Sequence, residues 1–196
     1  DEPLIVAIVK HNLGESLTRQ ADFGRAAASY REALDAFRAQ GNTWYVAGTL
    51  RGLALTALRQ GDHGYAREAL RESMALATQL GENLWIAEDL ETLSALAEAG
   101  DDPVRATVLL SMGDHVRRRI GIPVEPLERQ EWEHLVNSLR AQLGDDAFAG
   151  AALTYVTYRE AFYHLDSGAR AVSGSTATAG IFATYPQPYL SLGGGF

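Results

Sequence analysis

Apolar residues recur three and four positions apart over most of the first 165 residues, and short breaks rich in Gly, Gln and Asp interrupt them. This spacing is typical of amphipathic helices. The clearest stretch runs from Trp44 to Gly81, where two such segments meet at Gly61 and Asp62. The pattern predicts two helices that fold back on each other as a hairpin.

The same pattern returns when the sequence is shifted by 40 residues. An aspartate, a small residue and a glycine recur in step, at Asp22, Asp62 and Asp102, at Ala26, Ala66 and Ala106, and at Gly41, Gly81 and Gly121. We expect the aspartates to cap helix N-termini, the glycines to end helices, and the alanines to lie where paired helices come close. An internal period of this size is typical of solenoids. The sequence thus predicts an all-α protein, a right-handed α-solenoid of about four antiparallel helix pairs.

The predicted repeat domain covers residues 1–165. Its units lie at about 4–41, 43–81 and 83–121, and an out-of-register pair at 125–165 is expected to cap the array. In the first helix, helical spacing is fitted by Leu4, Ala7, Ile8, His11, Leu13, Gly14 and Leu17. Residues 166–196 lose helical periodicity and predict an extended tail. Ile181 to Leu192 is expected to lie along a groove of this molecule or of a neighbour, or else to derive from cloning or a frameshift; both alternatives stay open.

These positions resemble the tetratricopeptide repeat. The resemblance rests on Leu13, Gly14, Ala26, Tyr30, Ala33 and Leu34 in the first unit, and on Leu53, Ala54, Ala66 and Leu70 in the second. The 40-residue unit and the order of residues 106–148 are similar to the C-terminal repeats of MalT-like, AfsR-like and LuxR-type bacterial signal-transduction ATPases. The resemblance covers residues 4–152 and implies bacterial signalling or transcriptional regulation. It carries over no ATPase or promoter-binding activity, because the nucleotide-binding loop and DNA-binding motif of those proteins are absent from this sequence.

Composition narrows the function classes. The chain of 196 residues has 17 Lys and Arg against 25 Asp and Glu, a net charge of −8, which disfavours binding to nucleic acid or to an anionic membrane. No cysteine is present, so disulfides and thiolate metal sites are excluded. No apolar run is long enough to span a membrane, and a cytoplasmic location is expected.

Candidate catalytic chemistry is sparse. No two of the five histidines have a metal-binding i,i+4 spacing, and no glycine-rich loop carries a phosphate-binding lysine. We therefore expect a non-enzymatic protein without a cofactor or metal. Trp44 and Trp85, at the starts of their predicted helices, are expected to pack between helices rather than form a ligand cage.

The concave face of the predicted solenoid is the candidate binding site. In such a stack the first helix of each pair lines this face. The 40-residue register and the seventh helix place these residues there: His11, Asn12, Glu15, Arg51, Leu55, Leu58, Glu88, Glu91, Thr92 and Glu131. The surface suits a protein or peptide segment with apolar anchors and at least one basic group.

Three further interpretations stay open. The same residues could be solvated helix faces without a partner. The domain could instead sense a small-molecule effector, as a MalT-like region would. Self-association is also expected to be possible, through the solenoid ends or by exchange of the tail.

Overall fold

The computed structural model describes residues 2–153, which are helical apart from short turns. Its helices are α1 (Glu2–Arg19), α2 (Phe23–Ala39), α3 (Thr43–Arg59), α4 (His63–Leu80), α5 (Asn83–Ala99), α6 (Pro103–Ile120) and α7 (Pro126–Leu143). Residues 145–153 are helical as well. The chain divides into two compact units, residues 1–96 and 97–196, and each is described by itself.

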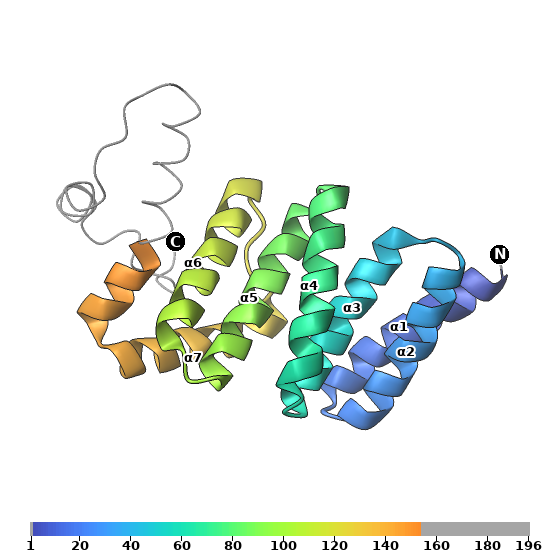
Figure 1. Ribbon diagram of the computed structural model, residues 1–196, viewed down its shortest axis with the longest axis horizontal. Coiled ribbons are helices and arrows are strands. Elements are labelled where there is room, and N and C mark those ends of the chain that lie inside the picture. The colour runs from blue at the N-terminus through green and yellow to red at the C-terminus, as the bar shows by residue number, and fades with distance from the viewer. Residues whose placement is uncertain (1, 154–196) are drawn as a thin grey trace, which may run out of the picture. The chain divides into compact units, whose positions relative to one another are not determined.

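In the first unit, successive helices pack in pairs. α1 packs on α2, α3 packs on α4, and α2 joins the two pairs by packing on α3 (Figure 1). The all-α architecture of consecutive helix pairs predicted from the sequence is therefore confirmed for the part of the chain that the structure describes.

The turns repeat with the 40-residue period. After α1, α3 and α5, the amide of the capping aspartate donates to a carbonyl five residues earlier: Asp22 to Leu17, Asp62 to Ala57 and Asp102 to Ala97, at 2.9, 2.9 and 3.0 Å. The carboxylate of each aspartate then accepts from the amide three residues later, which confirms the predicted N-caps. Gly41, Gly81 and Gly121 have φ angles of 66°, 71° and 72°, so the predicted left-handed helix ends are also confirmed.

The alanines of the repeat pattern are completely buried: Ala26, Ala66 and Ala106. Tyr30 of α2 is buried as well, and its ring fills a slot between α1 and α3. A Cβ atom at Gly14 would lie 2.7 Å from Cδ1 of Tyr30, and one at Gly52 would lie 2.5 Å from Cζ. These distances are shorter than carbon atoms tolerate, so this ring requires a glycine on each side.

The second unit has its own apolar cluster. Ala106 and Leu110 of α6 pack with Val136 and Leu139 of α7 and with Phe148. At the start of this unit, Glu98 of α5 accepts a hydrogen bond from Ser138 Oγ at 2.6 Å and one from Gln142 Nε2 at 3.2 Å. These bonds tie the end of α5 to α7.

The expectation for Trp44 holds in part. Its ring packs between helices, 4.5 Å from the ring of Trp85 on α5, and its Nε1 donates to Glu82, but the side chain is 45% exposed and does not lie in the core. Leu13, whose position fits the spacing of the first helix, is exposed. The end of the capping pair (154–165), the tail (166–196) and its segment Ile181 to Leu192 lie outside the described residues.

Candidate functional site

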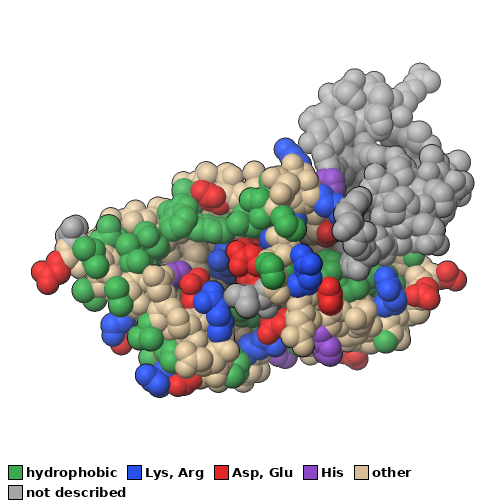
Figure 2. Space-filling model, turned by 180° about the vertical axis from the view of Figure 1, so that it is seen from behind, with side chains coloured by type: hydrophobic (Ala, Val, Ile, Leu, Met, Phe, Trp, Pro, Cys, Tyr) green, Lys and Arg blue, Asp and Glu red, His purple; other side chains and the backbone are tan. Residues whose placement is uncertain are grey.

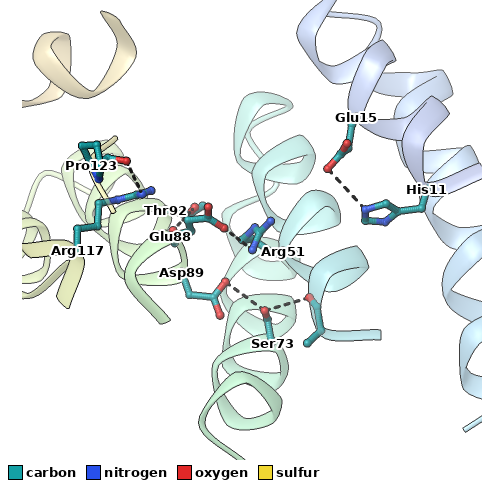
Figure 3. Close-up of polar contacts among 10 residues, drawn as sticks. His11, Glu15, Arg51, Ser73, Glu88, Asp89, Thr92, Arg117 and Pro123 are labelled. Carbon is teal, nitrogen blue, oxygen red and sulfur yellow. Dashed lines mark hydrogen bonds and ion pairs between the residues drawn. The ribbon is translucent and has the colours of Figure 1, made fainter. Parts of the chain in front are cut away.

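The first helices of the second and third pairs bring Arg51 and Glu88 together. Arg51 lies on α3 and Glu88 on α5, and their side chains form an ion pair (Figure 3). The two side chains are 23% and 21% exposed, so the pair is largely screened from bulk water but still reachable. The Arg51 guanidinium also lies 5.6 Å from the ring centroid of Trp85, within cation–π range. The Arg51 guanidinium is therefore oriented by two neighbours, Glu88 and Trp85.

A second polar group joins α1 to α3. The hydroxyl of Thr49 donates to the Tyr45 carbonyl at 2.7 Å, so it accepts from Nδ1 of His11 at 3.0 Å. Nε2 of His11 then faces Glu15 Oε1 at 3.6 Å. The contact with His11 lowers the pKa of Glu15, against the opposing effect of burial, and Arg19 and Arg51 act in the same direction as His11. Glu15 is thus held as a carboxylate.

A third group, not foreseen from the sequence, lies beneath the ion pair. Asp89 of α5 is fully buried, and its Oδ1 is 3.1 Å from Oγ of Ser73 on α4. The same Oγ lies 3.1 Å from the carbonyl of Ala47 on α3, and Asp89 Oδ2 has no hydrogen-bond partner. Burial raises the pKa of Asp89 to about 7, although Ser73 and Arg51 favour its charged form. One buried carboxyl group thus connects three helices.

The remaining predicted site residues are placed as follows. Leu55 and Leu58 are half-buried on α3, Glu91 and Thr92 are half-buried on α5, and Asn12 is exposed on α1. Thr92 Oγ1 donates to the carbonyl of Glu88, one turn earlier in its own helix. Glu131 is exposed on α7, in the other compact unit. The structure therefore pairs Arg51 with Glu88 and His11 with Glu15.

Charged side chains of both signs lie close together near the middle of the face seen in Figure 2. Within residues 2–153 there is no group of three or more His, Asp or Glu side chains that could hold a metal ion. The polar groups of the first unit are paired with one another rather than directed at one reacting atom.

The 40-residue period of the sequence indicates that Asp89 stands at an unusual position for a carboxylate. Positions 9, 49 and 89 are equivalent in the 40-residue period and carry Val, Thr and Asp. The register makes Asp89 equivalent to Thr49, which is buried between helices, and to Val9, which is exposed on α1. A helix position that is apolar or hydroxylated in its other copies is an unusual place for a carboxylate.

Comparison with known proteins adds two findings. Residues 5–79 match the sequence model of the tetratricopeptide repeat family, which covers less than half of the chain but nearly all of α1 to α4. No solved structure matches the chain.

The curated proteins that match part of the chain belong to a different class of protein, the aquaporins. The chain is 41% identical over 85 residues to aquaglyceroporin-2 of Rhizophagus irregularis, which is 43% of this chain and 26% of that protein. It is 38% identical over 84 residues to aquaporin-10 of Homo sapiens, 43% of this chain and 28% of that protein. The chain thus spans about a quarter of the length of these relatives. None of the helices in the described part combines the length and apolar character that crossing a bilayer requires.

The match at 5–79 covers the helix pairs α1–α2 and α3–α4 and the turns at Asp22, Gly41 and Asp62. Helices α1 to α4 are therefore similar to tetratricopeptide repeats both in sequence and in the way their pairs stack.

Proposed function

We propose that the first unit is a non-enzymatic scaffold that binds a protein or peptide segment along α1, α3 and α5. The observation that carries the proposal is the tetratricopeptide match over α1 to α4, beside which α3 and α5 bring Arg51 and Glu88 together. Leu55 lies one turn after Arg51 on α3. Helix-pair repeats typically use such extended surfaces for protein recognition.

The ion pairs along α1, α3 and α5 narrow the chemistry that we expect of the bound segment. Arg51 is already paired with Glu88 and stacked near Trp85, and Glu15 is a carboxylate beside His11. A segment bearing an acidic group would meet a cation whose charge is largely neutralised and would face Glu15, Glu88 and Glu91. A segment bearing Lys or Arg beside apolar residues is favoured, because the carboxylates attract the cation and Leu55 and Leu58 accept the apolar side chains. We further propose bacterial signalling or transcriptional regulation as the setting.

The test is selection of peptides from a random library on the full chain, followed by titration of the selected peptides by fluorescence anisotropy. We expect peptides that combine a basic residue with apolar residues. Changing Arg51 and Leu55 together to alanine should weaken binding at least tenfold, because the apolar contact of Leu55 is lost and Glu88 loses the guanidinium that orients it. The circular dichroism spectrum should not change.

A matched control uses the second helix of the same pair. Arg71 and Leu80 are exposed on α4, and their joint replacement by alanine should leave peptide binding unchanged. If the α4 pair abolished binding while the α3 pair did not, the placement of the binding surface would be wrong.

The aquaporin matches support a second candidate, namely that the chain joins repeat-type helices to aquaporin-type sequence. Its partner would then be met at a membrane. Flotation of the full chain with lipid vesicles in a density gradient tests this candidate. Recovery with the vesicles would favour it, and recovery in the dense fractions would exclude it.

A further inference from the structure

Trp44 leaves much of its ring open to solvent, although three neighbours hold the ring in place. It lies in the first turn of α3, and its ring contacts those of Trp85 at 4.5 Å and Tyr45 at 4.8 Å. Its Nε1 donates to Glu82 Oε1 at 3.3 Å, yet the residue is 45% exposed. Helices α1 and α2 precede α3, and α5 follows it, so Trp44 lies inside the repeat array. A fixed aromatic surface of this kind is typical of interaction hot spots.

Glu82 places a carboxylate at the edge of this ring. Position 82 is equivalent in the 40-residue period to Asn42, whose side chain caps α3 by accepting from the Tyr45 amide. The longer side chain of Glu82 reaches the indole of Trp44 instead. The indole donates to one carboxylate oxygen, and both oxygens of a carboxylate can accept. The second oxygen can therefore accept from a cation that lies on the ring.

The neighbouring tryptophan shows which chemical group suits such a surface. The Arg51 guanidinium lies 5.6 Å from the ring centroid of Trp85 and forms an ion pair with Glu88. One guanidinium thus interacts with an indole ring and a carboxylate together. Trp44 and Glu82 offer the same two groups, and within residues 2–153 no Lys or Arg side chain contacts either of them.

This surface continues the face of α3 that carries Arg51 and Leu55. The three residues are seven and four positions apart, and both spacings return to the same side of a helix. Seven residues of helix span about 10 Å. A segment that lies along Arg51 and Leu55 could therefore also reach Trp44 with one side chain.

We propose that Trp44 and Glu82 form a recognition site for an arginine side chain of the bound segment. The guanidinium lies on the Trp44 ring and pairs with Glu82. Arginine is favoured over lysine, because the guanidinium is planar, stacks on aromatic rings and is less strongly hydrated than an ammonium group. The inference rests on the proposed function, since it assigns a site to the basic group of the segment.

NMR titration of the full chain with a small probe tests the site directly. The three tryptophans give three indole N–H signals, and Trp44→Leu identifies one of them. The array accommodates leucine at this position, because its equivalents are Leu4 and Leu84. N-acetyl-arginine amide should shift the Trp44 signal in a saturable way and leave that of Trp132, on α7, unchanged. N-acetyl-citrulline amide, which has a similar shape but no charge, should cause no saturable shift.

Two outcomes of this titration would overturn the proposal. One is an equal response to the two probes, or no response to either. The other is a saturable shift of the Trp44 signal by N-acetyl-leucine amide at the same concentrations, which would identify an apolar site instead.

The role of the carboxylate is tested by Glu82→Gln. Glutamine keeps an oxygen that can accept from the indole but has no charge, so the variant should bind N-acetyl-arginine amide at least threefold more weakly. Glu68→Gln changes an exposed glutamate of α4 and should leave the affinity unchanged. Equal affinity of the Glu82→Gln variant and the original chain would contradict the proposed pairing.

Peptides selected from the random library separate this inference from the proposed function. Trp44→Leu should weaken an arginine-containing peptide at least fivefold. Replacing that arginine by citrulline should cause a similar loss, and the two losses should not add, because they remove the same contact. If the peptides bind the Trp44→Leu variant and the original chain equally, the arginine site is wrong but the scaffold function stands. If no peptide is selected, the scaffold function fails, and the probe titration still decides whether Trp44 and Glu82 bind a guanidinium.

Discussion

Protonation of the buried Asp89 carboxyl group determines which hydrogen bonds it and Ser73 can form. The hydroxyl of Ser73 has one hydrogen but lies within hydrogen-bond distance of both the Ala47 carbonyl and Asp89 Oδ1. When Asp89 is protonated, it can donate to Ser73, and Ser73 can donate to Ala47, so each short contact has its own hydrogen. The raised pKa of about 7 agrees with this arrangement.

We predict that Asp89→Asn stabilises the protein at pH 8. The carboxyl group has a pKa near 3.8 when unfolded and about 7 when folded. Its favourable contribution is therefore complete below pH 3.8 and is lost as the pH rises to 7. The asparagine amide can donate to Ser73 but cannot ionise. The gain in the free energy of unfolding should be on the order of a few kcal/mol at pH 8 and should vanish near pH 4.

Urea unfolding of both proteins at pH 4, 6 and 8 measures this difference. The control is Asp35→Asn, which changes an exposed aspartate of α2 and should shift stability by less than about 0.5 kcal/mol at each pH. If Asp89→Asn and the original chain lost stability in parallel between pH 4 and 8, the assignment of Asp89 as a neutral acid would be wrong.

At the scale of the elements, the turns after α1, α3 and α5 share one backbone conformation but not one residue type. Gly61 has φ of 79°, and its equivalents Ala21 and Asp101 both have φ of 59°. A left-handed conformation costs an L-residue roughly 1 kcal/mol, whereas glycine adopts it freely. The capping aspartates and the recurring amide-to-carbonyl bonds hold these two residues in place.

We predict that Ala21→Gly stabilises the first helix pair by about 0.5 kcal/mol, because relief of strain outweighs the greater entropy of unfolded glycine. Thermal unfolding followed by circular dichroism provides the measurement. Ala28→Gly, at an exposed position inside α2, should instead lower stability by about 1 kcal/mol. A loss of stability in both variants would show that the turn is not strained at Ala21.

Local chemistry explains why the sequence predicted the helices well. Aspartate caps, glycine ends and helical apolar spacing act over a few residues, so Asp22, Gly41 and Ala26 could be assigned without tertiary information. The exposure of Leu13 and Trp44 could not be assigned in this way, because it depends on which helices pack against them. The same limit applies to Asp89, whose partner Ser73 lies 16 positions away in the chain and contacts the Ala47 carbonyl in turn.

The candidate site was predictable in part for the same reason. The register placed Arg51 and Glu88 on first helices of neighbouring pairs, and the structure joins them. It did not reveal that His11 would be held between helices by Thr49, because the hydrogen bond depends on the rotamers of both side chains.

At the scale of the whole molecule, two apolar clusters that share no residue are found within residues 2–153. One includes Phe37, Leu53 and Leu70, and the other includes Leu110, Leu139 and Phe148. In arrays of helix pairs, stability is approximately a sum of local terms, and parts can open separately.

We predict that Phe37→Ala, at a completely buried position, destabilises the first unit by about 3–5 kcal/mol. Hydrogen exchange measured by mass spectrometry should show lost protection in α1 to α4, while α6 and α7 keep theirs. Leu139→Ala serves as the reciprocal control and should release α6 and α7 instead. Uniform loss of protection in either variant would show that the two clusters unfold as one.

The ring of Tyr30, held between Gly14 and Gly52, has a consequence for how the binding surface is curved. The Tyr30 ring lies between the backbones of α1 and α3, so its size sets the distance between these two helices and thereby the angle between the first two pairs. A smaller residue at position 30 would let the pairs close up, and a side chain at either glycine would wedge them apart. A substitution at buried Tyr30 would then change which segments fit the proposed binding surface, although Tyr30 itself would not contact them.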